Sequence, residues 1–208
     1  SYSTESTMHT YVHKAIDLLK NSDFFSHINE STINQAISTF QNWDLNTDIS
    51  NINAALPILS FASILDTDPI KVTNEILVKN ISRAINHLSL YYNKMNIEWG
   101  ELNRLIRGSS NLELAGGPDI PRAIYAIPQE DEGQLKSIAG DCYILLARWN
   151  KNGKVFSESI HQYGSATQNT NSKHYQDQCI LFAKEEFKEI SIYKDEVIRE
   201  AVDVLILK

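Results

Sequence analysis

Apolar and polar positions in the first ninety residues alternate with the period of an α-helix, in four successive segments. The four segments span residues 4–20, 31–42, 51–65 and 73–93. The apolar faces of three of them hold Met8, Val12, Ala15, Ile16 and Leu19; Ile33, Ala36, Ile37 and Phe40; and Ile76, Leu77, Ala84, Ile85, Leu88 and Tyr92. Ser31 is placed to cap the second segment, and Asp48 or Ser50 to cap the third. The pattern therefore predicts helices up to about residue 93.

The pattern changes after Gly100, where glycine and proline separate short apolar runs. Residues 136–149 and 154–164 have the composition of two strands. The dipeptide Asn152-Gly153 lies between them and supplies the positive φ angles of a tight hairpin. These features predict an antiparallel pair in the second half of the chain.

Residues 144–147 are continuously apolar, which is typical of a strand covered on both faces. A helical pattern returns over residues 174–188, and residues 196–207 fit either a short helix or a strand. The sequence thus predicts an α+β fold. It divides into a helical region over residues 1–96 and an α+β segment over residues 97–208, where covering helices pack on an antiparallel sheet.

Composition narrows the class of protein. The 208 residues carry a net charge of −7 and are 42% hydrophobic, which are values of a globular chain. The acidic balance argues against nucleic acid as a partner, because such a partner requires a basic face. No apolar run approaches the roughly 20 residues that span a bilayer, so no membrane segment is expected. No signal peptide is visible.

The chain has two cysteines, Cys142 in a strand pattern and Cys179 in a helical one. A disulfide between them would suit an exported protein, but one pair does not make a disulfide framework. Free cysteine is usually buried. The sequence therefore favours two free, buried thiols.

Two groups of residues have the chemistry of metal ligands. Glu5, His9 and His13 recur every four residues, so a helix would place them on one face. A looser set consists of His161, His174, Asp177 and Cys179. Neither has the spacing of a standard zinc site, and a solvated helical face accounts for the first.

Gly116-Gly117-Pro118 fits a tight turn and lacks the rest of a phosphate-binding loop. We expect no metal and no cofactor.

Residues 97–187 contain an ordered succession of motifs. They are Ile-Glu-Trp-Gly-Glu-Leu-Asn-Arg-Leu-Ile-Arg-Gly at 97–108, Leu-Ala-Gly-Gly-Pro at 114–118, Ala-Gly-Asp-Cys-Tyr-Ile-Leu-Leu-Ala-Arg-Trp at 139–149, Tyr-Gly-Ser-Ala-Thr-Gln at 163–168 and His-Tyr-Gln-Asp-Gln-Cys-Ile-Leu-Phe at 174–182. This succession resembles the C-terminal part of the β-chain of the penicillin acylase family. The resemblance is to the branch that contains cephalosporin acylases, aculeacin acylase and acyl-homoserine-lactone acylases.

The resemblance implies part of an N-terminal-nucleophile hydrolase with a four-layer αββα fold. Such an enzyme is exported to the periplasm as a precursor that cleaves itself into two chains. It hydrolyses a linear amide through an acyl-enzyme on an N-terminal Ser, Thr or Cys. The implied partners are the α-chain, the N-terminal part of the β-chain and a small acylated amide substrate. Nucleic acid and membrane are not among them.

The resemblance places no catalytic residue in this segment. Ser1 precedes a polar run and an amphipathic helix, whereas the family nucleophile opens a buried strand. Arg148 occupies the position at which cephalosporin acylases place a glutamate that orients the catalytic histidine. A guanidinium cannot accept an imidazole N–H. Either this branch orients its histidine differently, or the protein has lost hydrolase activity.

Five residues of the motifs have side chains suited to an active-site rim. They are Trp99, Tyr163, His174, Tyr175 and Gln178. Ordinary core and turn packing is the more common role of such residues. Two hypotheses therefore stand beside the hydrolase: a noncatalytic homologue or structural fragment, and a free-standing helical binding module built on residues 1–93. For the hydrolase segment, we expect the apolar strand 143–147 to leave a face uncovered by this chain.

Overall fold

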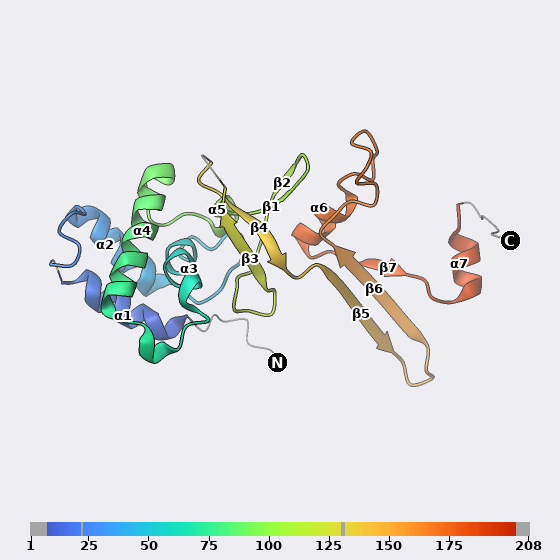
Figure 1. The fold of residues 1–208 in the computed structure, drawn as a ribbon. Coiled ribbons are helices and arrows are strands. Elements are labelled where there is room, and N and C mark those ends of the chain that lie inside the picture. The colour runs from blue at the N-terminus through green and yellow to red at the C-terminus, as the bar shows by residue number, and fades with distance from the viewer. Residues whose placement is uncertain (1–7, 22, 130–131, 203–208) are drawn as a thin grey trace. The chain divides into compact units, whose positions relative to one another are not determined.

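A computed structural model describes residues 8–21, 23–129 and 132–202 of the chain. The chain divides into two compact units, Ser1–Asp141 and Cys142–Lys208, which are described separately below (Figure 1). The first unit contains a group of helices and a four-stranded sheet, and the second contains a three-stranded sheet with helices. The predicted α+β class is confirmed. Within the described residues, no helix is both long enough and apolar enough to cross a bilayer.

The helices of the first unit follow the predicted segments closely. They are α1 (His9–Leu19), α2 (Glu30–Asn42), α3 (Ala55–Phe61), the 3-10 turns η1 (Ala62–Ile64) and η2 (Pro69–Lys71), α4 (Asn74–Tyr92) and the short α5 (Trp99–Leu102). Helix α1 packs on α2 and α4, and α3 packs on α2 and α4. The predicted apolar faces form the core between them, with Met8, Ala15, Leu77 and Leu88 all fully buried. Periodicity therefore located these helices correctly.

The predicted helix caps are wrong. Helix α2 is capped by Asn29, whose side chain accepts a hydrogen bond from the backbone N–H of Thr32, so Ser31 lies inside the helix. Helix α3 begins after Ala54 without a side-chain cap, several residues beyond the predicted Asp48 and Ser50. The polar side chains before this helix form hydrogen bonds with each other instead of capping it. For example, the Asn51 side-chain amide donates to the Asp44 carboxylate.

The sheet of the first unit has the order β2-β1-β4-β3. Its strands are β1 (Asn103–Arg107), β2 (Ser110–Glu113), β3 (Ile124–Pro128) and β4 (Leu135–Gly140). Strands β1 and β4 are parallel, with Asn103 paired to Leu135, and the other neighbours are antiparallel. One predicted strand, 136–149, is in fact two strands of different sheets. It breaks because Gly140 has a φ of +111° and Asp141 donates its N–H to Ala123.

The second unit is built on the predicted hairpin. Its strands, β5 (Tyr143–Trp149), β6 (Val155–His161) and β7 (Lys188–Ile190), are antiparallel in the order β5-β6-β7. The turn is closed by the N–H of Asn150, which donates to the Lys154 carbonyl. Gly153 has a φ of +79°, whereas Asn152 keeps a negative φ. The hairpin is confirmed, but only one of its two central residues adopts the predicted conformation.

Two helices accompany this sheet. They are α6 (Asp177–Lys184), which packs on β6, and α7 (Lys194–Glu200). The predicted helix 174–188 ends early, because Glu185 takes a left-handed φ of +60° and the chain then enters β7. The ambiguous segment 196–207 is helical up to Glu200, and its last residues lie outside the described part.

The two thiols differ in their surroundings. Both cysteines are free, and Cys179 is buried on α6, where its Sγ contacts the Gln162 carbonyl at 3.2 Å. Cys142 is exposed, so its predicted burial is wrong. It lies on the short connection between β4 and β5 rather than within a continuous strand. The apolar strand pattern around it was therefore misleading.

Candidate functional site

A cavity of about 510 Å³ lies within the first unit, against the helices α3 and α4 and the strands β3 and β4. Most of its lining is apolar, which is typical of small-molecule sites. The lining residues are Ile58, Leu59, Ala62, Ser63, Asn80, Arg83, Ala84, Asn86, His87, Trp99, Asn103, Pro118, Ile124, Tyr125, Ala126, Pro128 and Leu135. No Asp or Glu is among these lining residues. The cavity therefore combines apolar walls with a few polar groups from helix α4.

Helix α4 contributes the basic side chains of the cavity. Arg83 and His87 are four residues apart, so they lie on one face of the helix. The His87 ring nitrogen Nε2 lies 2.7 Å from the Gly133 carbonyl oxygen, which the Tyr92 hydroxyl also approaches at 3.2 Å. Burial raises the pKa of Tyr92, and the Glu101 carboxylate raises it further against the opposing effect of Arg104. Tyr92 thus stays protonated and donates its hydrogen bond.

Asn103 begins strand β1 and is fully buried. Its backbone N–H donates to Trp99, its carbonyl accepts from Leu114, and its Nδ2 donates to the Leu114 carbonyl at 2.7 Å. The remaining polar atom, Oδ1, has no hydrogen-bond partner among the described residues. A buried acceptor without a partner costs free energy. Asn103 thus lies beside the cavity with one buried acceptor that has no partner among the described residues.

Trp99 forms another part of the wall and anchors the loop behind it. The indole is buried, and its Nε1 donates to the Gly116 carbonyl at 2.9 Å. Gly116 has a φ of +105°, and a Cβ there would meet the Arg122 carbonyl at 2.6 Å. Only glycine fits this position. The tryptophan thus holds Gly116, Gly117 forms an isolated bridge with Ala123, and the predicted turn begins only at Pro118.

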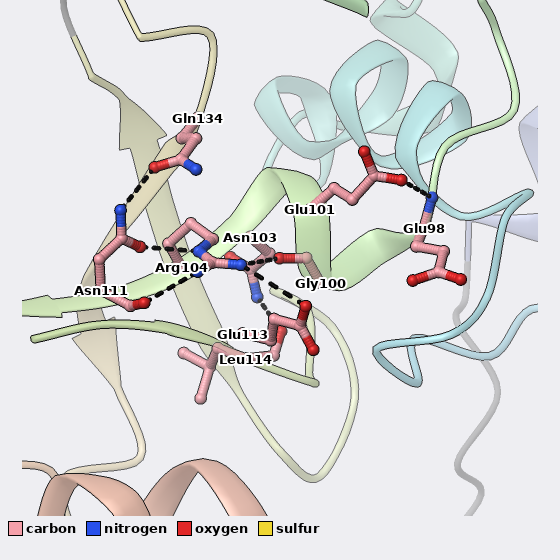
Figure 2. Close-up of polar contacts among 9 residues, drawn as sticks. All are labelled: Glu98, Gly100, Glu101, Asn103, Arg104, Asn111, Glu113, Leu114 and Gln134. Carbon is pink, nitrogen blue, oxygen red and sulfur yellow. Dashed lines mark hydrogen bonds and ion pairs between the residues drawn. The ribbon is translucent and has the colours of Figure 1, made fainter.

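A network of polar contacts fixes α5 and the strands beside the cavity (Figure 2). The Arg104 guanidinium donates to the carbonyl of Gly100 and to both the side chain and the carbonyl of Asn111, at 2.7 to 2.8 Å. Its Nη1 also lies 3.9 Å from the Glu113 carboxylate. The Asn111 amide continues the network to Gln134 before β4. Within the motif at 97–108, Arg104 therefore links α5 to strands β1 and β2 by hydrogen bonds.

Arg148 is exposed on strand β5 of the second unit. Its guanidinium lies 5.6 Å from the centre of the Phe156 ring, in the cation–π range. Among the residues that the structure describes, no carboxylate forms an ion pair with it. In this position Arg148 supports the hairpin by stacking on the neighbouring strand.

The histidine motif of the second unit forms a small cluster around a carboxylate. Asp177 accepts hydrogen bonds from the N–H and the hydroxyl of Ser165, and His174 Nδ1 lies 3.1 Å from its Oδ2. Burial alone would raise the pKa of Asp177, but the bonds from Ser165, Gln178 and His174 outweigh it, and the pKa is lowered. The serine contacts the carboxylate, not the imidazole. The cluster is not a nucleophile–base pair.

The other sequence candidates do not converge on a site. Glu5 and Ser1 lie outside the described residues, and His9 and His13 are exposed on α1. Among the residues that the structure describes, no three His, Cys, Asp or Glu side chains are grouped to hold a metal ion. Cys179 lies buried on α6 with its thiol against a backbone carbonyl, as described above.

The aromatic and amide residues of the motifs pack as core and turn groups. Gln178 is buried and Tyr175 is partly buried, whereas Tyr163 is 46% exposed. Gly164 lies so close to Tyr175 that a Cβ would overlap its backbone carbonyl. The motifs at 163–168 and 174–182 therefore hold two loops together.

Sequence reasoning did not single out Arg83, His87 or Asn103. The first two were visible as a basic pair at helical spacing in the predicted helix 73–93. Nothing local marks Asn103, because its role depends on contacts with Leu114 and with the cavity.

The comparisons with known proteins agree with the order of the motifs. A search of curated proteins gave no match. The family model of penicillin amidase matches residues 3–199, which is nearly the whole chain. The chain therefore belongs to the penicillin amidase family of acylase-type hydrolases.

Proposed function

We propose that this chain is the sheet-building C-terminal part of a penicillin-amidase-type enzyme whose nucleophile lies in another part of the same precursor. The observation that carries the proposal is the open strand β5. Within the described residues it pairs with β6 alone, and its large apolar side chains are exposed. Those side chains are Tyr143 (57% exposed), Leu145 (53%), Leu146 (47%) and Trp149 (72%).

Successive residues of a strand point to opposite faces, so Leu145 and Leu146 expose both faces of β5. Its outer edge also lacks a partner strand among the described residues. A long, apolar, unpaired edge is a surface that natural proteins cover. An enzyme whose sheet continues with strands from another part of the precursor would cover the edge and both faces of β5. The α-chain and the N-terminal part of the β-chain are the proposed partners.

The proposed reaction is hydrolysis of a linear amide. The hydroxyl or thiol of an N-terminal Ser, Thr or Cys adds to the amide carbonyl while its α-amino group takes the proton. The C–N bond breaks, the amine leaves with that proton, and an acyl-enzyme remains. Water then releases the carboxylic acid. Preorganised donors outside this segment stabilise the oxyanion. The contribution of this chain is to position the sheet.

Arg148 favours a second candidate, a family member that keeps the fold without hydrolysing amides. Its fixed positive charge stands where cephalosporin acylases have a histidine-orienting carboxylate. The activity of the unsubstituted complete protein separates the two candidates. An active enzyme hydrolyses an acyl amide without any substitution, whereas a noncatalytic homologue does not.

The experiment compares the purified chain with the complete gene product. Each is incubated with a series of acyl p-nitroanilides, and release of p-nitroaniline is followed by absorbance. We expect turnover from the complete protein and none from the chain alone. Light scattering and binding of an apolar dye should also show that the isolated chain self-associates or exposes apolar surface.

Activity of the isolated chain that disappears on Ser1→Ala would overturn the assignment of the nucleophile to another part. A chain that remains a monomer and binds no dye would contradict the proposed role of β5 as a covered strand. An inactive complete protein with an intact N-terminal nucleophile would favour the noncatalytic homologue.

A further inference from the structure

The turn between β5 and β6 places Asn152 directly before Gly153 on the surface of the second unit. Both residues are exposed. The side-chain carboxamide of Asn152 forms no hydrogen bond with any of the described residues. A Cβ built on Gly153 would meet no atom within 4 Å, so the space beside this residue is open. The Asn152 side chain is therefore free to turn towards the backbone nitrogen of Gly153.

This pair is the one Asn-Gly in the sequence. The backbone nitrogen that follows an asparagine can attack the carboxamide carbon and close a cyclic imide, a succinimide. Glycine favours the attack, because it has no Cβ to obstruct the approach and its backbone rotates more freely than that of other residues. Every other asparagine of the chain is followed by a residue with a Cβ. The sequence thus makes Asn152 the most reactive asparagine.

The folded turn opposes this reaction. The Gly153 N–H donates to the Asn150 carbonyl at 3.0 Å, so its nitrogen must leave that bond before it attacks. The Asn150 side-chain oxygen accepts from the N–H groups of Asn152 and Lys154, both at 3.0 Å. Asn150 therefore holds the backbone on both sides of Gly153. The rate of the reaction then follows the local opening of the turn.

We propose that Asn152 is a site of spontaneous deamidation, and that Asn150 is the positioning residue that slows it. When the turn opens, the Gly153 nitrogen forms a bond to Cγ of Asn152. The side-chain nitrogen leaves as ammonia and takes the proton of the Gly153 amide. Water then opens the succinimide at one of its two carbonyls, which leaves either aspartate or isoaspartate. Water is the one co-reactant, and no group is oxidised or reduced.

The products change the hairpin that carries β5. Each places a carboxylate at position 152, between Lys151 and Lys154 in the sequence. Isoaspartate also routes the backbone through the side chain, which adds an atom between the bonded residues Asn150 and Lys154. The turn is then too long for its present hydrogen bonds. The inference rests on this turn alone and does not depend on whether the complete protein hydrolyses amides.

The test follows deamidation of the 208-residue chain during incubation at mildly alkaline pH. Peptides from cleavage after glutamate keep the turn in one piece, and mass spectrometry measures the amide lost at each asparagine. Labelling by an isoaspartyl methyltransferase measures the isoaspartate product. We expect Asn152 to react faster than every other asparagine of the folded chain. The chain unfolded in urea should react faster still at this position, because the turn no longer restrains it.

Variants separate the site from the restraint. Asn150→Ala removes the acceptor of two N–H groups and should accelerate the reaction about fivefold to twentyfold, since one neutral hydrogen bond corresponds to about fivefold. Asn150→Asp keeps an accepting oxygen and should restore most of the slow rate. Asn152→Gln should abolish the reaction, because its longer side chain does not close the same ring.

Asn29→Ala is the matched control. It also removes an asparagine oxygen that accepts a backbone N–H, but at the cap of α2 in the first unit. It should leave the rate at Asn152 unchanged. Circular dichroism of each variant checks that the fold is retained.

Three results would overturn the inference. The first is an Asn152 that stays intact in the folded chain after the urea-unfolded chain has reacted fully. The second is an equal rate for the unsubstituted chain and Asn150→Ala, which would remove the restraint. The third is equal acceleration by Asn150→Ala and Asn29→Ala, which would assign the effect to overall stability instead of the turn.

Discussion

Replacing Trp99 by phenylalanine tests whether the tryptophan–glycine contact stabilises the first unit. The substitution removes the indole N–H that donates to the Gly116 carbonyl at 2.9 Å. Gly116 is buried, and no other donor of the described residues is recorded for its carbonyl. An orphaned buried acceptor costs about 1–3 kcal/mol. The smaller ring also buries roughly 40 Å² less apolar area, which adds about 1 kcal/mol.

Tyr92→Phe is the matched control. It too removes one donor to a glycine carbonyl, here that of Gly133 at 3.2 Å. This carbonyl keeps its 2.7 Å contact with His87 Nε2, so no acceptor is orphaned. The expected loss is therefore only about 0.5–1 kcal/mol. The two substitutions differ mainly in whether the glycine carbonyl retains a partner.

Urea unfolding followed by far-ultraviolet circular dichroism measures both variants, since most helices belong to the first unit. We expect Trp99→Phe to lower the free energy of unfolding by about 2–4 kcal/mol, clearly more than Tyr92→Phe. Equal losses in the two variants would refute the reasoning. They would mean that the buried Gly116 carbonyl finds another donor or water when the indole is removed.

Three further predictions concern local structure. Gly140→Ala should destabilise the chain several times as much as Gly153→Ala. A Cβ at Gly140 would overlap a backbone carbonyl, whereas a Cβ at Gly153 would meet open space. Thermal unfolding of the two variants compares them directly. Asn29→Ala should cost about 1 kcal/mol, as loss of a helix cap does, while Ser31→Ala costs little, and equal losses would contradict the cap assignment. The pKa of Asp177 is lowered in the folded protein, so this carboxylate stabilises the fold at pH values above its unfolded pKa of about 3.9. That stability is lost as the pH falls through the lower folded pKa. Asp177→Asn should therefore reduce the loss of unfolding free energy at acidic pH, measured by unfolding at a series of pH values.

The sequence alone determined the features that depend on near neighbours along the chain. Apolar residues at helical spacing located α1, α2 and α4, because a helix must bury its apolar face whatever it packs against. The hairpin at Gly153 was likewise visible, since its backbone conformation needs glycine locally. The order of motifs from residue 97 onwards identified the family. The α+β class follows from these same patterns.

Tertiary structure decided what depends on distant contacts. The apolar run 136–149 fitted one strand. In the structure the Asp141 N–H donates to the Ala123 carbonyl, and the chain there leaves β4 before β5 begins. Local propensity cannot reveal a break that a distant carbonyl imposes. The cap of α2 moved from Ser31 to Asn29 because helix entry depends on backbone direction as well as on residue type.

The cavity was decided by the fold alone. Arg83 and Asn103 are twenty positions apart, and only the tertiary fold brings both to the lining of one cavity. The Asn103 Nδ2 donates to the carbonyl of Leu114, eleven positions away, and its Oδ1 has no partner among the described residues. Sequence periodicity records which face of an element is buried. It does not record which distant residues pack against the buried face, and the candidate site is formed by those tertiary contacts.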